Sequence, residues 1–203
     1  MAPAKQRAPV DERRSGQMTH GTALDALASS NRILVVGPSG SGKTYLSLRL
    51  GRILGHRLIH LDARFWRSGW VSTPQAEWRR TVESLTRQER WIMDGTYEST
   101  LDLRIPAAET IIVIERSRWI CLWGVIRRAM MYGRGPRPDA PPKQPIDLSY
   151  LRYIWHYPAR TRPLVDELIE KHGSDKCVLV LHGAREIEEL ISDLEVRTRG
   201  GAG

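Results

Sequence analysis

The sequence has few cysteines and no long apolar run. It contains two cysteines, Cys121 and Cys177, which are too far apart for a CxxC motif. A disulfide scaffold needs a much higher cysteine density, so we expect no bridge and a reducing, cytoplasmic location. The longest apolar stretch runs over eight residues, from Trp119 to Ile126. A membrane-spanning helix needs about 20, so the sequence predicts a soluble protein without a membrane partner.

The N-terminal residues also lack the apolar core of a secretory signal. Basic residues alternate there with prolines and acids, and we interpret 1–28 as a disordered basic arm. Residues 197–203 are glycine-rich at their end and are expected to form a loose tail. Between them, 29–196 are expected to fold as one domain, because 203 residues with 41% apolar composition suffice for a single core.

Positive charge predominates: 31 Lys and Arg against 23 Asp and Glu give a net charge of +8. Such a surplus fits arginines placed around an anionic ligand, and it also fits attraction to a nucleic-acid backbone. The charge alone does not choose between these interpretations.

Five short apolar runs predict buried strands. They cover 32–36, 57–61, 90–93, 110–114 and 176–181, and they are nearly continuous in Ile, Leu and Val. That pattern is typical of parallel strands covered on both faces. Helical stretches alternate with them, at 43–54, after Pro74, at 119–131, from 148 towards Trp155, at 162–172 and at 185–194. The order of elements predicts a three-layer α/β fold.

Residues 133–147 contain five prolines and two glycines without apolar periodicity. We interpret them as a long loop, and long loops inside compact domains are often lids. The lid region as a whole is expected over about 127–162. Arginines lie on its entry and within it, at Arg127, Arg128, Arg134 and Arg137. Phosphoryl transfer relies on guanidinium groups that close over the transferring group, although any single arginine is more often a solvated surface residue.

One motif matches GxxxxGK[ST] in full, directly after the first predicted strand and before a helix. It consists of Gly37, Pro38, Ser39, Gly40, Ser41, Gly42, Lys43 and Thr44. In such a Walker A loop, glycines let backbone amides curl around phosphate oxygens, the lysine reaches the β- and γ-phosphates, and the threonine binds Mg²⁺. The motif predicts a nucleoside triphosphate, which we take to be ATP, together with Mg²⁺.

Two acids follow later strands. Asp94 ends the strand at 90–93 and is a candidate to hold Mg²⁺ through its water shell, or it merely forms the strand-ending turn with Gly95. Asp62 follows the second strand and is a candidate to bind or deprotonate a hydroxyl acceptor, or else it caps the next turn. Trp66, close behind Asp62, either stacks on a base or sugar or packs in the core.

Several segments together resemble the topology modulation protein (FlaR-like) family, which consists of small P-loop proteins related to adenylate kinase. The resemblance rests on Ile59–Asp62 with Phe65-Trp66 and Gly69-Trp70, on Trp91–Tyr97, Thr100–Arg104 and Arg118–Trp123, and on Arg137–Asp139, Trp155 and Tyr157-Pro158. It covers about 32–182. It implies a nucleoside-monophosphate-kinase-like fold with a five-stranded parallel sheet in the order 2-3-1-4-5, a lid after the fourth strand, and phosphoryl transfer from ATP with Mg²⁺.

The resemblance also suggests roles for individual residues. It places the adenine ring near Gly183 and Arg185. The Asp-Gly element lacks the Phe-Pro-Arg continuation of adenylate kinases, so Arg104 is expected to replace the missing AMP-contacting arginine. Arg128 stands where the second lid-entry arginine belongs, while Gly124 stands at the place of the first.

The resulting hypothesis is an ATP-dependent kinase of a small molecule or nucleotide, with Lys43, Arg128 and Asp62 as catalytic candidates. The phosphate acceptor is not identified by the sequence. One alternative is a nucleic-acid-associated NTP-binding protein that affects DNA topology and uses the basic arm and lid arginines, although no recognition motif supports it. Another is an NTPase that acts without an acceptor.

Overall fold

A computed structural model describes residues 19–132, 139–142 and 144–200 of the chain. The main sheet contains the five parallel strands β1 (Arg32–Val36), β2 (Leu58–His60), β5 (Trp91–Asp94), β6 (Thr110–Ile114) and β7 (Cys177–Leu181). Their spatial order is β2-β5-β1-β6-β7. Within this sheet alone the order is 2-3-1-4-5, as predicted. The antiparallel pair β3 (Trp66–Arg67) and β4 (Val71–Ser72) lies outside it and shifts the numbering.

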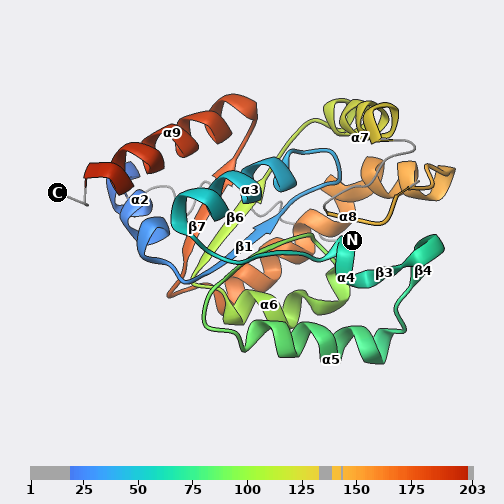
Figure 1. The fold of residues 1–203 in the computed structure, drawn as a ribbon, viewed down its shortest axis with the longest axis horizontal. Helices are drawn as coiled ribbons and strands as arrows, with labels where there is room; N and C mark the ends of the chain where they lie inside the picture. The colour runs from blue at the N-terminus through green and yellow to red at the C-terminus, as the bar shows by residue number, and fades with distance from the viewer. Residues whose placement is uncertain (1–18, 133–138, 143, 201–203) are drawn as a thin grey trace, which may run out of the picture.

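The helices cover both faces of this sheet (Figure 1). In chain order they are α2 (His20–Ser29), α3 (Lys43–Leu54), α4 (Asp62–Phe65), α5 (Gln75–Thr86), α6 (Leu101–Ala107), α7 (Arg118–Tyr132), α8 (Leu148–His172) and α9 (Ala184–Gly200). Two short 3₁₀ turns, η1 (Ser68–Trp70) and η2 (Glu98–Thr100), precede β4 and α6. The three-layer α/β architecture predicted from the sequence is confirmed.

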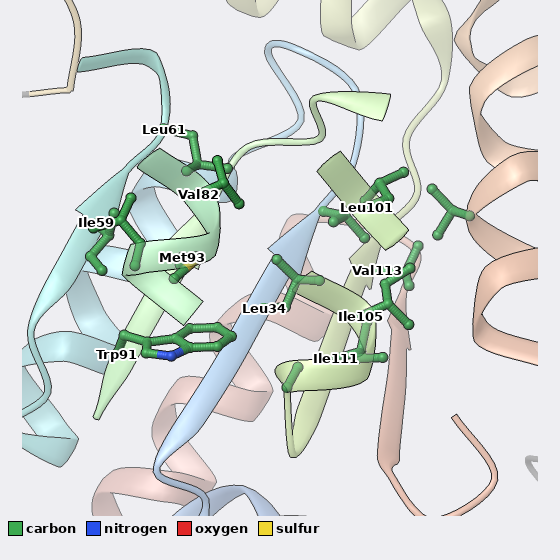
Figure 2. Close-up of a cluster of buried hydrophobic side chains, with 14 of the residues drawn as sticks. Leu34, Ile59, Leu61, Val82, Trp91, Met93, Leu101, Ile105, Ile111 and Val113 are labelled. Carbon is green, nitrogen blue, oxygen red and sulfur yellow. The ribbon is translucent and has the colours of Figure 1, made fainter. Parts of the chain in front are cut away.

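Alternation along the strands divides the core into two halves. Leu34 and Val36 of β1 face a cluster built with α5, α6 and the end of α8, while Ile33 and Val35 face α2, α3 and α9. Figure 2 shows the first cluster, in which Trp91 and Met93 lie beside Leu34 under α5 and α6. Burial on both faces explains why these strands are continuously apolar.

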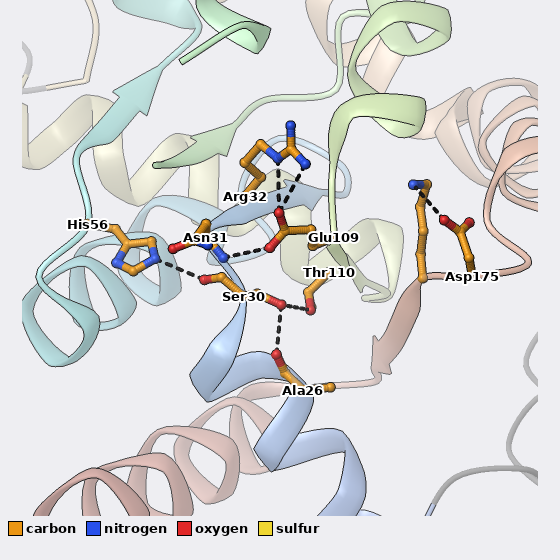
Figure 3. Close-up of polar contacts among 9 residues, drawn as sticks. Ala26, Ser30, Asn31, Arg32, His56, Glu109, Thr110 and Asp175 are labelled. Atoms are coloured by element: carbon orange, nitrogen blue, oxygen red, sulfur yellow. Dashed lines mark hydrogen bonds and ion pairs between the residues drawn. The ribbon is translucent and has the colours of Figure 1, made fainter. Parts of the chain in front are cut away.

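The prediction of disorder is wrong from Thr19 onward, because residues 20–29 form α2. Leu24 and Leu27 of this helix are buried in the second core cluster. A polar network at the amino-terminal end of β1 holds the helix in place (Figure 3): the Ser30 hydroxyl contacts Thr110 Oγ1 at 2.6 Å and donates to the Ala26 carbonyl at 2.7 Å. The rest of the predicted arm, residues 1–18, lies outside the described residues.

Two other boundaries differ from the prediction. Residues 148–172 form one helix, α8, although Pro158 and Pro163 lie inside it and two separate helices were expected. Buried side chains along α8, among them Ile154, Tyr157 and Val165, supply packing that outweighs the missing proline amides. Similarly, α9 continues to Gly200, so 197–200 are helical and not a loose tail, while 201–203 lie outside the described residues.

Both cysteines are buried and free. None of the helices in the described part of the chain is long and apolar enough to cross a membrane.

We predict that Leu27→Ala destabilises the protein by about 2–4 kcal/mol, because the substitution leaves a cavity in a core position that is fully buried. Denaturant unfolding of the full chain measures the change. Leu148→Ala is the matched control, since Leu148 is 85% exposed and should change stability by less than about 0.5 kcal/mol. Equal effects of the two substitutions would contradict the packing of α2 against the core.

Candidate active site

One large cavity of about 1070 Å³ lies at the carboxyl end of the sheet. The Walker A loop forms one side of it. Gly37, Ser39, Gly40, Gly42, Lys43 and Thr44 line the cavity, whereas Pro38 and Ser41 do not. The segment is curled, not extended, because Gly37, Gly40 and Gly42 all have positive φ angles of 152°, 83° and 104°. Helix α3 begins at Lys43, so its N-terminus points partial positive charge at an anion in this loop.

Lys43 lies over this loop. Its Nζ donates to the carbonyl oxygens of Gly37 and Pro38, each at 2.8 Å. An ammonium group has three protons, so one remains for a phosphate oxygen. Burial lowers the pKa of Lys43, and the charges of Asp62 and Asp94 oppose this decrease. The lysine is therefore positioned between the loop and the acids across the cavity.

Helix α7 packs directly on the Walker A loop. A Cβ atom at Gly40 would lie 2.1 Å from the carbonyl oxygen of Cys121, and one at Gly124 would lie 2.7 Å from the carbonyl oxygen of Gly40. Only glycine at both positions permits this approach. The contact fixes where the α7 arginines enter the cavity.

The residues predicted to hold Mg²⁺ both line the cavity. Asp94 is buried, and its Oδ1 pairs with His60 Nδ1 at 2.9 Å, whereas its Oδ2 is buried without a hydrogen-bond partner among the described residues. The Thr44 hydroxyl lies 3.4 Å from Asp139 Oδ2. No cluster of three or more His, Cys, Asp or Glu side chains suited to a metal occurs in the described ranges. The orphaned Asp94 oxygen and the Thr44 hydroxyl thus fit a Mg²⁺ ion whose other ligands are nucleotide oxygens and water.

The carboxylate of Asp62 lines the same cavity, at the start of α4. The Tyr97 hydroxyl donates to its Oδ1 at 2.6 Å. Burial raises the pKa of Asp62 above its usual value, although the Tyr97 hydrogen bond and the charge of Lys43 act in the other direction. A carboxylate with a raised pKa is well suited to accept a proton near neutral pH.

Arg127 and Arg128 of α7 line the cavity. One Arg128 nitrogen, Nη2, donates to Gln144 Oε1 at 2.8 Å and to the Tyr150 hydroxyl at 3.0 Å. The arginine thus connects α7 with α8 across the predicted lid. The other two predicted lid arginines, Arg134 and Arg137, lie outside the described residues. The nucleic-acid alternative also relies on the lid arginines.

Arg104 does not serve as an acceptor-binding arginine, which corrects the expectation from the sequence. It is fully buried and does not line the cavity. Its guanidinium donates to the carbonyl oxygens of Gly95 at 2.7 Å, Tyr97 at 2.8 Å and Thr96. Burial lowers its pKa to about 9, so it remains charged at neutral pH. The four hydrogen bonds of this side chain all go to backbone carbonyl oxygens, and its burial away from the cavity separates it from a ligand there.

Trp66 lines the cavity and belongs to an aromatic wall defined by Phe65, Trp66, Trp70 and Tyr97. Phe65 contacts Trp66 and Tyr97 with ring centroids 4.9 and 4.8 Å apart, and Trp66 lies 5.3 Å from Trp70. Tyr97 of this wall is also the residue that bonds Asp62. Gly183 and Arg185 do not line the cavity, and Arg185 is exposed and paired with Glu189 at 2.7 Å. Their contact with adenine stays a prediction.

Sequence reasoning assigned no role to several side chains of the site. They are Tyr97, Glu98, Arg116, Asp139, Gln144, Tyr150 and Tyr153, all of which line the cavity. Asp139 and Tyr97 belong to the segments that carry the family resemblance, but the sequence analysis gave them no role. Tyr150 and Tyr153 lie one turn apart on α8, and such helical spacing equally fits core packing. No pattern in the sequence distinguishes these cavity-lining residues from residues that only pack in the core.

We predict that Arg104→Lys destabilises the protein by about 3 kcal/mol, because the single nitrogen of a lysine cannot reproduce the planar fork of Nε, Nη1 and Nη2 that reaches four backbone carbonyl oxygens. Chemical denaturation measures this change. Arg87→Lys provides the control, since Arg87 forms an exposed ion pair with Glu83 and should lose less than about 0.5 kcal/mol. An Arg104→Lys protein of unchanged stability would refute the structural role.

Comparison with solved structures identifies similar folds. Shikimate kinase from Acinetobacter baumannii matches with a TM-score of 0.53 at 15% identity, over 88% of this chain and 98% of that chain. Deoxyadenosine kinase from M. mycoides matches with a TM-score of 0.48 at 12% identity, over 83% of this chain and 98% of that chain. A gluconokinase from Sinorhizobium meliloti matches with a TM-score of 0.43 at 16% identity, over 85% of this chain and 98% of that chain. No family model and no curated protein matches the sequence. The likeness to shikimate kinase shows that the chain has the fold of a P-loop kinase.

Proposed function

We propose that this chain is an ATP-dependent phosphotransferase that acts on a hydroxyl group of a small molecule. One observation carries the proposal: the Walker A loop with Lys43 and the carboxylate of Asp62 line a single cavity. Each of the two groups also shifts the pKa of the other by its charge, which supports a common reacting centre. The similar structure of shikimate kinase was determined in complex with shikimate, which carries hydroxyl groups, and this agrees with the assignment.

In the proposed reaction, an acceptor oxygen attacks the γ-phosphorus of ATP while the bond to the bridging β,γ-oxygen breaks. ADP leaves with that electron pair, and the hydroxyl proton passes to the Asp62 carboxylate. Tyr97 holds one Asp62 oxygen by its hydrogen bond and so orients the other towards the acceptor. Lys43 and Arg128 neutralise the charge on the transferring group.

Thr44 and Asp94 would hold Mg²⁺ in this site, Thr44 through its hydroxyl and Asp94 through water. The ion supplies charge neutralisation on the nucleotide phosphates. His60 fixes the orientation of the Asp94 carboxylate from the other side. The Walker A amides and the start of α3 supply the remaining positive potential.

The finer assignments belong to the same proposal. They are membership of the topology modulation protein (FlaR-like) family, a relation to adenylate kinase, a lid over about 127–162 and a cytoplasmic location. Helices α7 and α8 pack together through Cys121, Val125 and Ile154, which supports a lid anchored on this helix pair.

Lys43→Ala should abolish phosphoryl transfer and raise the Kd for ATP at least tenfold, because it removes the ammonium that contacts the phosphates. Screening hydroxyl compounds for acceptor-dependent ADP release, together with calorimetric ATP titration, measures both effects. Lys171→Ala, at the exposed end of α8, is the control and should behave as the parent. Unchanged ATP binding by Lys43→Ala, or no ATP binding by the parent protein with Mg²⁺, would end the proposal.

Asp62→Asn is expected to lower kcat by about 10²–10⁴-fold, because the amide cannot accept the hydroxyl proton. The same substitution should stabilise the protein by about 1 kcal/mol, which raises Tm by about 2–4 °C. Burial raises the Asp62 pKa, so the ionised carboxylate is unfavourable in the folded state, whereas the amide still accepts the Tyr97 hydrogen bond. Calorimetry and steady-state kinetics test the two effects together. A variant that is both stable and active would show that Asp62 is not the base.

A further inference from the structure

Arg116 is a cavity arginine that the proposed mechanism does not yet use. It lies between β6, which ends at Ile114, and α7, which begins at Arg118, and its side chain lines the cavity. Its Nε is buried and has no hydrogen-bond partner among the described residues. Leaving a buried, charged donor without an acceptor is unfavourable. Such a group in a cavity therefore points to an anionic ligand that supplies the missing acceptor.

The segment that carries Arg116 adjoins the Gly37 end of the Walker A loop. A Cβ atom at Gly37 would lie 2.6 Å from the carbonyl oxygen of Ile114, two residues before Arg116. Lys43 Nζ lies at the same end, because it donates to the carbonyl oxygens of Gly37 and Pro38. In a Walker A loop the backbone amides cradle the α- and β-phosphates, whereas the lysine reaches the β- and γ-phosphates. Arg116 therefore lies near the place expected for the terminal phosphates.

Contacts at the start of α7 also bring Arg116 close to the loop. The Cys121 thiol donates to the Arg116 carbonyl oxygen at 4.0 Å, and the carbonyl oxygen of Cys121 lies against Gly40. Burial raises the pKa of the Cys121 thiol, and the positive charges of Lys43 and Arg116 oppose this increase. The two cations thus act on one buried group that packs on the Walker A loop.

The acid next to Arg116 in the chain is engaged elsewhere. Glu115 accepts a hydrogen bond from Arg162 Nε at 2.6 Å, and its other carboxylate oxygen lies 3.3 Å from His182 Nδ1. Arg162 belongs to α8, and His182 follows β7. Glu115 does not line the cavity, whereas Arg116 does. The two neighbours therefore have different tasks, since Glu115 connects β6 with α8 and the end of β7.

We propose that Arg116 binds the γ-phosphate of ATP and neutralises part of its charge, together with Lys43 and Arg128. A guanidinium presents its N–H donors in a planar fork that fits phosphate oxygens. The γ-phosphate would supply the acceptor that the buried Nε lacks. Arg116 forms no covalent bond and exchanges no proton in this role. The inference rests on the proposed phosphotransferase function.

Calorimetric titration of the full chain with ATP or ADP, each in the presence of Mg²⁺, tests the assignment. Arg116→Gln removes the charge, and we expect it to raise the Kd for ATP at least about tenfold. The Kd for ADP should change by less than about twofold, because ADP lacks the γ-phosphate. Arg118→Gln is the matched control, since Arg118 lies 4.7 Å from the centroid of the Trp155 ring and does not line the cavity. Both Kd values should then equal those of the parent protein.

Thermal unfolding without nucleotide separates this role from a structural one. Because the Arg116 Nε is buried without a partner, Arg116→Gln should leave Tm unchanged or raise it. Arg116→Lys keeps the charge but not the planar fork, so its Kd for ATP should lie between those of the parent and of Arg116→Gln. A lower Tm in both variants, with ATP and ADP binding weakened equally, would show that Arg116 only supports the fold and would overturn the inference.

The remaining outcomes overturn different statements. If the parent protein binds ATP and Arg116→Gln binds it equally tightly, the inference is wrong while the phosphotransferase function stands. Equal weakening of ATP and ADP at an unchanged Tm would overturn the assignment to the γ-phosphate. A parent protein that binds no ATP with Mg²⁺ would overturn the phosphotransferase function, and the inference with it.

Discussion

The hydrogen bonds from buried Arg104 to the carbonyl oxygens of Gly95, Thr96 and Tyr97 hold the segment on which the whole site depends. This segment has an unfavourable backbone. Gly95 has a φ of 126°, and Tyr97 has a φ of 34°, which non-glycine residues rarely adopt. A fully buried guanidinium that is bonded to three consecutive carbonyl oxygens compensates for this local cost.

Each residue of the segment then fixes a different part of the cavity. Asp94, immediately before it, has a buried Oδ2 without a hydrogen-bond partner among the described residues, which we propose faces Mg²⁺. The Thr96 hydroxyl donates to the Gly37 carbonyl at 2.8 Å and accepts from the Gly37 amide at 3.2 Å, so it holds the first residue of the Walker A loop. Tyr97 orients Asp62. The positions that we propose for the metal, the triphosphate and the acceptor are therefore set relative to one another by one short turn.

The parts of the fold that could be predicted are those in which local pattern and packing agree. Continuous apolar runs identified the strands, and the glycine, lysine and threonine of the Walker A loop have a spacing that few other structures require. Arg104 could not be interpreted from its position in the sequence, because a buried arginine and a ligand-binding arginine look alike until their partners are known. Likewise, α2 and the unbroken α8 follow from tertiary packing that outweighs the basic, proline-rich sequence nearby and the two internal prolines.

Close packing between α7 and the Walker A loop also determines where the α7 arginines lie. The resemblance to adenylate kinases suggested an arginine at the position of Gly124. A side chain there cannot coexist with the Walker A loop, since even a Cβ atom would meet the Gly40 carbonyl oxygen at 2.7 Å. Residues three and four positions further along a helix lie on the same face one turn later, and these positions are Arg127 and Arg128. The helix thus packs directly on the loop and supplies its positive charge one turn further along the helix, where Arg128 also contacts Gln144 and Tyr150. Positive charge is thus retained in the cavity beside the Walker A loop, and the departure of Gly124 from the adenylate kinase pattern has a steric cause.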